Sequence, residues 1–263
     1  MTEGIIMLAV ERRNKIEEII TKNKSVLVLE LAKQFEVTTE TIRGDLEKLE
    51  KQGVLVRTYG GATLVEGSDA DMAYTERAAV NAEGKERIGQ RAARLVKNGE
   101  TIFLDASTSS LYVAKNIKDK SGITVITNAE RVVAELAGCE NIKVICTGGR
   151  LVPKNMSYCG RTAEETIRTK YYANKLFFSC RGATILRGLA DSTEEDAEIK
   201  KAMLERSETS VFLCDYKKLG KLGVPIISDL KSIDIVITDI KLSEEWNSVL
   251  EENDVELIEV PKE

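Results

Sequence analysis

Histidine is missing from the 263-residue sequence, and proline, tryptophan and the aromatic residues as a group are scarce. Without histidine the chain lacks the commonest metal ligand and the commonest general base, which excludes a zinc site and a Ser-His-Asp triad. Five cysteines occur, but none forms a C-x-x-C pair, so we expect reduced, mostly buried thiols. The sequence therefore predicts no metal and no cofactor.

Long apolar runs are also lacking. No stretch approaches the length of a membrane span, and the N-terminal segment MTEGIIMLAV has no basic flank typical of a secretory signal. We therefore expect a cytoplasmic protein without membrane contact. The length exceeds what one small domain needs, and a hydrophobic content of 43% suits a substantial core, so two domains are expected.

The stretch from residue 29 to residue 62 predicts a short helix, a tight turn, a second helix and a small hairpin. Thr38 is a good N-cap for the second helix, because its hydroxyl accepts from free backbone N–H groups. Within that helix Ile42, Leu46 and Leu49 form one buried stripe. With an amphipathic helix before it, this layout is typical of a winged helix-turn-helix. A plain helical domain with a solvated polar face fits the periodicity equally well.

The residue identities favour the first interpretation. The run VTTETIRGDLEKLE, followed by VLVRTYGGA, strongly resembles the DNA-binding domain of the DeoR family of bacterial transcription regulators. The family pattern is V-S-x-x-T-I-R-R-D-L-x-x-L-E, a short gap, then R-x-H-G-G-A. The resemblance implies a winged helix-turn-helix over residues 1–64 that binds double-stranded operator DNA. The residues expected to contact DNA are Thr38, Thr39, Thr41, Arg43, Arg57 and Tyr59.

Three positions depart from the family pattern. Thr38 replaces Ser and keeps the capping hydroxyl, and Tyr59 replaces His with another polar-tipped ring. Gly44 replaces the second Arg of the R-R pair, which removes a cation from the face expected to meet DNA. A glycine inside a helix also costs about 1 kcal/mol relative to alanine.

The charge distribution lacks the basic excess common in DNA-binding domains. The net charge of the chain is −5, and residues 1–64 carry ten basic and ten acidic side chains. Affinity for DNA would therefore depend on two copies of the domain, as in a homo-oligomer, and on local placement of cations. These cations are Arg12, Arg13, Lys22, Lys24, Arg43, Lys48, Lys51 and Arg57.

After a predicted linker at residues 65–82, residues 83–263 predict a second domain. Apolar runs alternate there with helical patterns, which is typical of a mainly parallel α/β sheet covered on both faces. Ligands bind such sheets at the carboxyl ends of the strands. The runs are Thr101–Leu104, Ile123–Ile126, Ile142–Cys146, Lys175–Phe178, Ser210–Cys214, Asp234–Thr238 and Val255–Ile258.

Polar residues follow several of these predicted strands. The first ends in DASTSS, whose hydroxyls and backbone N–H groups at a helix start would form a phosphate cradle. Asn128 follows the second strand, Gly148-Gly149 the third, and Asp215 a later one with Lys218 nearby. Together they would suit a phosphorylated sugar or polyol, although unrelated strand-to-helix turns would explain the same residues.

A second resemblance covers residues 85–219, which look like the sensor domain of the same family. That domain is related in fold to ribose-5-phosphate isomerase and glucosamine-6-phosphate deaminase. The family order K-x-x-I, D-x-G-T-T, V-x-T-N, G-G, G-x-x-D and D-x-x-K recurs here, with Ser107 in place of Gly. The implied effector-binding residues are Asp105, Ser107, Thr108, Ser109, Ser110, Asn128, Gly148, Gly149, Asp191 and Lys218.

Both halves together predict a transcription regulator and not an enzyme, with no catalytic residue. We expect a repressor of a carbohydrate uptake or catabolism operon, released from its operator by a phosphorylated sugar. One alternative is an isomerase-like enzyme with Asp105, Asp191 or Glu195 as base and Lys218 as electrostatic stabiliser. Another is a sensor module whose DNA binding is weakened by Gly44.

Overall fold

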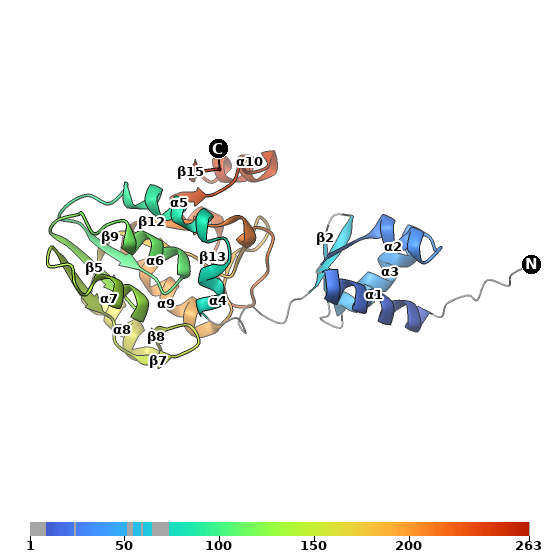
Figure 1. Ribbon diagram of the computed structural model, residues 1–263, viewed down its shortest axis with the longest axis horizontal. Helices are drawn as coiled ribbons and strands as arrows, with labels where there is room; N and C mark the ends of the chain where they lie inside the picture. Colours follow the sequence, from blue (N-terminus) through green and yellow to red (C-terminus); the bar gives the residue numbers. More distant parts are fainter. Residues whose placement is uncertain (1–8, 24, 52–54, 59, 65–73, 263) are drawn as a thin grey trace, which may run out of the picture. The chain divides into compact units, whose positions relative to one another are not determined.

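A computed structural model describes residues 9–23, 25–51, 55–58, 60–64 and 74–262 of the chain. The chain divides into two compact units, residues 1–71 and residues 72–263, and Figure 1 draws the elements of each. Among the described residues no helix is both long and apolar enough to cross a membrane.

The first unit is a helical domain with a small antiparallel sheet. Its elements are α1 (Ala9–Asn23), β1 (Ser25–Leu27), α2 (Val28–Gln34), α3 (Thr39–Lys51), β2 (Leu55–Thr58) and β3 (Gly61–Leu64). The sheet order is β1-β3-β2, so the strand after α1 pairs with the hairpin that follows α3. This is a winged helix-turn-helix, as the sequence predicts.

The core of this unit follows from the apolar spacing of its helices. Ile42, Leu46 and Leu49 of α3 are buried against Ile16 and Ile20 of α1 in one cluster. Between α2 and α3 the chain turns through Glu36, whose φ of 55° is unusual for a residue with a side chain. The turn thereby sets α3 across α2 with its polar face outward.

The second unit is built on a seven-stranded parallel sheet of order β15-β14-β12-β9-β4-β5-β6. All seven runs predicted from the sequence form these strands. They are β4 (Thr101–Leu104), β5 (Ile123–Thr127), β6 (Ile142–Cys146), β9 (Ala173–Phe178), β12 (Ser207–Cys214), β14 (Ile235–Thr238) and β15 (Glu256–Glu259).

Helices cover both faces of this sheet (Figure 1). On one face Ile102, Leu104 and Phe177 pack with α5 (Ala82–Ala93), α6 (Thr108–Lys115) and α7 (Glu130–Leu136). On the other face Phe103 and Phe178 pack with α8 (Arg161–Lys170), α9 (Glu194–Glu205) and α10 (Glu244–Glu252). Successive residues of a strand point to opposite faces, so each strand serves both layers. The predicted fold class is confirmed.

Several short elements were not predicted from the sequence. A hairpin joins β7 (Arg150–Val152) to β8 (Ser157–Cys159), and a small antiparallel sheet has the order β10-β11-β13. Its strands are Gly182–Thr184, Gly188–Ala190 and Ile226–Ser228, and single 3-10 turns lie at Tyr216–Lys218 (η1) and Leu230–Ser232 (η2).

The stretch expected to be a linker contains a helix. Helix α4 (Tyr74–Ala79) begins the described part of the second unit, and its first residue is buried. The last residues of the predicted linker therefore pack as part of the second unit.

Candidate DNA interface and effector site

Helix α3 presents the predicted DNA-reading residues at its first turns. The backbone N–H of Thr41 donates to the hydroxyl of Thr38 over 3.2 Å, so Thr38 is the N-cap predicted from the sequence. The hydroxyls of Thr38 and Thr41 lie 2.9 Å apart, while Thr39 is half-buried. The side chain of Arg43 is 61% exposed, and its guanidinium is 3.4 Å from a Glu40 carboxylate. Such an exposed pair is worth little, so Arg43 is available to a ligand.

Arg57 on β2 is bound more firmly to the helix. Its Nε lies 2.8 Å from Glu50 Oε2, and its backbone N–H donates to Glu50 Oε1 over 3.0 Å. These bonds hold the pKa of the Glu50 carboxyl below its usual value. Glu50 lies near the end of α3, so the pair joins the wing to that helix. Tyr59 lies outside the described residues.

Arg12 does not belong to the DNA-facing surface. Its Nε is 2.6 Å from Asp45 Oδ2, the residue is only 8% exposed, and Arg13 approaches the other Asp45 oxygen at 3.3 Å. The expectation that Arg12 adds to DNA affinity is wrong, because its charge is neutralised inside the first unit. The pair instead joins α1 to α3 and gives Asp45 a structural role.

Gly44 lies on the exposed side of α3, one residue beyond Arg43. A Cβ built at this position would meet no described atom within 4 Å. A larger side chain therefore fits there without any change in the first unit.

In the second unit, Asp105 organises the turn between β4 and α6. Its Oδ1 accepts from the backbone N–H of Ser107 at 3.2 Å and from the Ser110 hydroxyl at 2.5 Å. Its Oδ2 accepts from the backbone N–H of Ser179 at 3.3 Å. Asp105 is fully buried at the carboxyl end of β4, an interior strand of the sheet, where ligands bind in sheets of this kind.

The serines of the predicted cradle divide into two kinds. Ser107 is the N-cap of α6, and the Ser110 hydroxyl also lies 3.1 Å from the Phe177 carbonyl oxygen, so both are used within the fold. Ser109 differs: its hydroxyl is buried and has no hydrogen-bond partner among the residues that the structure describes. Thr108, beside it, is also buried. A buried hydroxyl without a partner is rare and is the group most suited to an incoming ligand.

Lys200 completes this site, although the sequence analysis missed it. From α9 its Nζ reaches Asp191 Oδ2 at 2.7 Å and Asp105 Oδ2 at 3.4 Å, and the side chain is buried. Burial alone would lower the pKa of Lys200, but the charges of Asp191, Asp105 and Asp196 outweigh it and raise the pKa. The ammonium is therefore charged and joins two predicted effector residues that are 86 positions apart in the sequence.

Asn128 and the glycine pair follow the ends of the neighbouring strands β5 and β6. The Asn128 side chain donates to the Tyr158 carbonyl oxygen at 3.2 Å, while its own carbonyl oxygen is buried without a described partner. Gly148 and Gly149 both have positive φ, and a Cβ on Gly149 would lie 2.7 Å from the Cys159 carbonyl oxygen. Close packing against β8 thus explains Gly149 without a ligand.

Three further residues were named from the sequence: Asp215, Lys218 and Glu195. Asp215 is buried and caps η1 by accepting from the backbone N–H of Lys217, whereas Lys218 is half-buried. Glu195, the third candidate base, pairs with Arg150 at 2.5 Å on the surface, away from the buried cluster. Glu195 therefore does not fit the role of base in the alternative enzyme, because its side chain is exposed and paired with Arg150.

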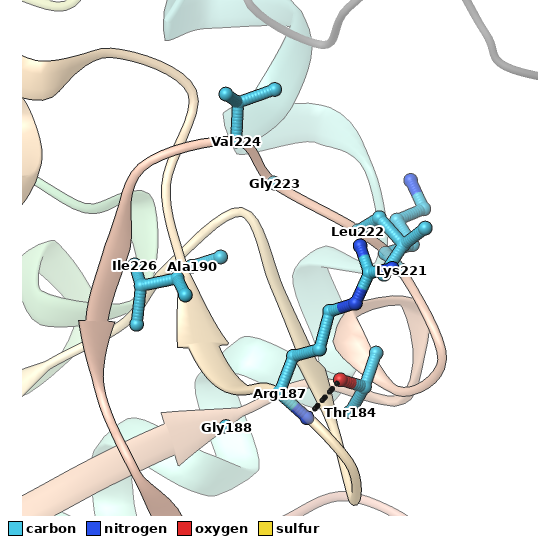
Figure 2. Close-up of a pocket in the computed structure, with 9 residues that line it drawn as sticks. All are labelled: Thr184, Arg187, Gly188, Ala190, Lys221, Leu222, Gly223, Val224 and Ile226. Carbon is cyan, nitrogen blue, oxygen red and sulfur yellow. Dashed lines mark hydrogen bonds between the residues drawn. The ribbon is translucent and has the colours of Figure 1, made fainter. Parts of the chain in front are cut away.

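A small pocket lies on the antiparallel sheet of the second unit (Figure 2). Arg187 is one of the residues that line it, and the backbone N–H of Arg187 donates to the Thr184 hydroxyl at 3.1 Å. The lining residues are Thr184, Arg187, Gly188, Ala190, Lys221, Leu222, Gly223, Val224 and Ile226. The predicted effector residues, all within the described part of the chain, are not among them.

A winged helix-turn-helix followed by an α/β unit with a buried polar cradle defines a DNA-binding transcription regulator that carries its own sensor. Residues 12–67 match the DeoR-like helix-turn-helix domain, and residues 80–240 match the DeoR C terminal sensor domain. The chain belongs to the DeoR family, as the resemblance of its motifs implies.

Relatives are similar over most of their length. The uncharacterized HTH-type transcriptional regulator YulB of Bacillus subtilis is 41% identical over 97% of this chain and 98% of its own. The transcriptional regulator GolR of Listeria innocua is 35% identical over 90% and 93%, respectively. Among solved structures, eIF2B delta from Chaetomium thermophilum has a TM-score of 0.46 at 14% identity, over 89% of this chain and 72% of that one. A ribose 5-phosphate isomerase has a TM-score of 0.40 at 12% identity, over 52% and 54%.

Proposed function

We propose that the chain represses an operon for uptake or catabolism of a carbohydrate, and that a phosphorylated sugar releases it from its operator. The cradle at the start of α6 carries this proposal. It combines the positive end of a helix dipole with the partnerless Ser109 hydroxyl, beside a buried lysine between two carboxylates. Phosphate suits the helix start, and carboxylates suit sugar hydroxyls.

The names of relatives support a carbohydrate operon. One is a putative aga operon transcriptional repressor of Escherichia coli O157:H7, 29% identical over 231 residues. Another is the L-fucose operon activator of Haemophilus influenzae, 33% identical over 228 residues. We propose repression by the present chain, acting in the cytoplasm, where its operator DNA lies.

On the DNA side, we propose that α3 enters the major groove and that the wing contacts the backbone. Thr38, Thr39, Thr41, Arg43, Arg57 and Tyr59 are the proposed contacts. Arg43 is the most exposed of the described arginines among them. Because the first unit is neutral and Arg12 is buried, one copy offers few phosphate contacts. Two or more copies therefore act together.

A catalytic role is the second candidate, because Asp105, Asp191 and Lys200 resemble the groups that move protons in a sugar-phosphate isomerase. We propose that no turnover occurs. A general base needs a free lone pair directed at the substrate. Asp105 Oδ1 already accepts two hydrogen bonds, Asp105 Oδ2 accepts one and lies 3.4 Å from the Lys200 ammonium, and Asp191 Oδ2 lies 2.7 Å from the same ammonium. Incubation with a panel of aldose and ketose phosphates, followed by product analysis, tests this. Isomerised product would establish the enzyme.

The effector assignment is tested by thermal shift with sugar phosphates, the matching free sugars and inorganic phosphate. We expect the phosphates to stabilise the second unit and the free sugars to do little. Ser109→Ala should keep the stability of the apo protein, since the hydroxyl makes no described bond, and weaken effector binding about 10- to 100-fold. Ser243→Ala, at the cap of α10, is the control. Equal stabilisation by free sugars would contradict the cradle.

The DNA assignment is tested by gel shift of Arg43→Ala on an operator selected from random DNA by the unmodified chain. If Arg43 contacts a base, the loss is about 1–3 kcal/mol. Lys33→Ala, an exposed cation at the end of α2, is the control. Unchanged affinity of Arg43→Ala would remove Arg43 from the interface.

A further inference from the structure

Helix α4 is the first described element of the second unit, and in the sequence it is the next described element after β3 of the first unit. We propose that the stability of α4 depends on whether the effector site is occupied, because side chains connected to the buried cluster of Asp105, Asp191 and Lys200 hold this helix in place. This inference rests on the proposed function, because it relates occupancy of the proposed effector site to release of DNA.

The first connection is a continuous chain of hydrogen bonds from α9 to α4. Asp196 lies one helical turn before Lys200, and its charge acts on the Lys200 ammonium. The Asn155 amide donates to Asp196 Oδ2 at 2.8 Å, and Arg77 of α4 donates to the Asn155 carbonyl oxygen at 2.9 Å. Both hydrogen bonds are short and partly buried, so a change in charge that acts on Asp196 reaches Arg77 through two side chains, Asp196 and Asn155.

The second connection is at the beginning of α4. Tyr74 is buried, and its backbone N–H donates to the Lys154 carbonyl oxygen at 3.1 Å, next to Asn155. Helix α4 also packs against α6, the helix that begins with the cradle (Figure 1). Burial raises the pKa of the Tyr74 phenol, and the charge of Asp105 raises it further. The negative charge of Asp105 in the buried cluster therefore acts on the Tyr74 phenol.

The third connection is at the end of α4. The last carbonyl groups of a helix lack partners within it. Lys85 provides a partner for one of them: its buried ammonium donates to the carbonyl oxygen of Arg77 at 2.6 Å, and also to that of Val80, one residue after the helix, at 2.5 Å. Burial lowers the pKa of Lys85 to about 8, against the opposing charge of Asp215. Both ends of α4 are thus fixed by the interior of the sensor unit.

An anionic effector would act on this arrangement through charge. The single positive charge of Lys200 now lies between the carboxylates of Asp105 and Asp191, and a phosphate nearby offers it a further anion. Any shift of the ammonium toward the effector changes the field at Asp196 and the bond from Asn155. Couplings between sites typically change affinity about 5- to 150-fold, so we expect effector-induced release of DNA within that range.

The proposal is tested first without any effector, by amide hydrogen exchange of the full chain. Lys200→Met removes the charge that balances the cluster, and Lys201→Met, on the exposed side of the same helix, is the matched control. We expect Lys200→Met to speed exchange in the α4 segment about tenfold or more, and Lys201→Met to leave it unchanged. Asn155→Ala, at a half-buried position, should speed the same segment.

If Lys200→Met does not fold, Asn155→Ala alone decides the first test. Unaltered exchange of α4 in Asn155→Ala, or in a folded Lys200→Met, overturns the proposal. These outcomes require no ligand and are independent of the proposed function.

The second test uses ribose 5-phosphate, fructose 6-phosphate, glucose 6-phosphate and inorganic phosphate, with calorimetry for binding and gel shift for DNA release. If one of them releases the unmodified chain from DNA, Asn155→Ala should bind it with similar affinity but lose most of that release. Asn253→Ala, at the half-buried residue that follows α10, should behave like the unmodified chain. Equal release from Asn155→Ala overturns the role of α4. If none binds, the effector assignment fails for these ligands, and the exchange experiment still decides the role of α4.

Discussion

Substitutions at Gly44 allow two effects to be measured separately at one position: the stability of α3 and the contact of α3 with DNA phosphates. The site is on the exposed face of α3, where an added Cβ meets no described atom within 4 Å, so the substitution causes no clash inside the unit. Replacing an interior helical glycine gains about 1 kcal/mol in helix stability. For Gly44→Arg, the exposed Glu40 lies four residues earlier and adds about 0.2–0.5 kcal/mol as an ion pair.

The gain should appear in thermal unfolding. For a domain of 60–100 residues, 1 kcal/mol corresponds to about 4–8 °C in Tm. We therefore expect the transition of the first unit to rise by about 4–8 °C in Gly44→Ala, and by the same or slightly more in Gly44→Arg. The alanine variant is the matched control, because it gains helix stability without adding charge.

Binding to DNA distinguishes the two variants. If position 44 faces a phosphate, Gly44→Arg steepens the dependence of log K on log salt by roughly 0.9 per copy, whereas Gly44→Ala leaves the slope unchanged. Fluorescence anisotropy between 50 and 200 mM salt measures both. Equal slopes for the two variants would refute the placement of Gly44 against the backbone. Tighter binding to random DNA with weaker binding to the selected operator would show instead that glycine permits a close approach to that operator.

Three further predictions concern groups that the structure shows in pairs. Asp45→Ala leaves the buried charge of Arg12 without its main partner, so urea unfolding should show a loss of about 3–5 kcal/mol in the first unit, and a loss below 1 kcal/mol would contradict this. Lys85 has a pKa of about 8 in the folded chain against 10.5 when exposed, so the unfolded chain binds the extra proton between these values. The difference in unfolding free energy between the unmodified chain and Lys85→Met should therefore rise from pH 8 to 10.5, and a constant difference would contradict the shift. Glu50→Gln frees the Arg57 guanidinium, so DNA binding should tighten, and unchanged affinity would show that the pair does not compete with DNA.

The seven strands of the main sheet were predictable because strands buried on both faces form continuous apolar runs. The β7–β8 hairpin and the β10-β11-β13 sheet were not, because their strands have three residues each and carry no clear alternation. Likewise α4 is only six residues long and follows a polar stretch, so its burial comes from tertiary packing that no local pattern indicates.

The residues of the candidate site that lie in a strand-to-helix turn could be predicted from the sequence, whereas the lysine that α9 contributes could not. Asp105 and the serines after it stand at a strand end, a place where ligand-binding residues are expected. Lys200 lies beside Lys201 in a charged helix, and the pair suggests a solvated face. One signal was present: Lys200 follows Asp196 by four residues and Ala197 by three, which places it on the inward stripe of α9.

The strand order of the main sheet also determines when, during synthesis of the chain, each unit is able to fold. The interior strand β4 pairs with β5 on one side, but its other neighbour is β9, about 70 residues further along the chain, and β12 must then join β9. The first unit closes its own sheet by residue 64. At synthesis rates of about 5–20 residues per second, the winged unit is complete roughly 8–30 seconds before β12 emerges. Long-range parallel pairing is also slow to form. We therefore expect a nascent chain to hold a folded DNA-binding unit before it has any means of sensing an effector, and control begins only with about the last fifth of translation.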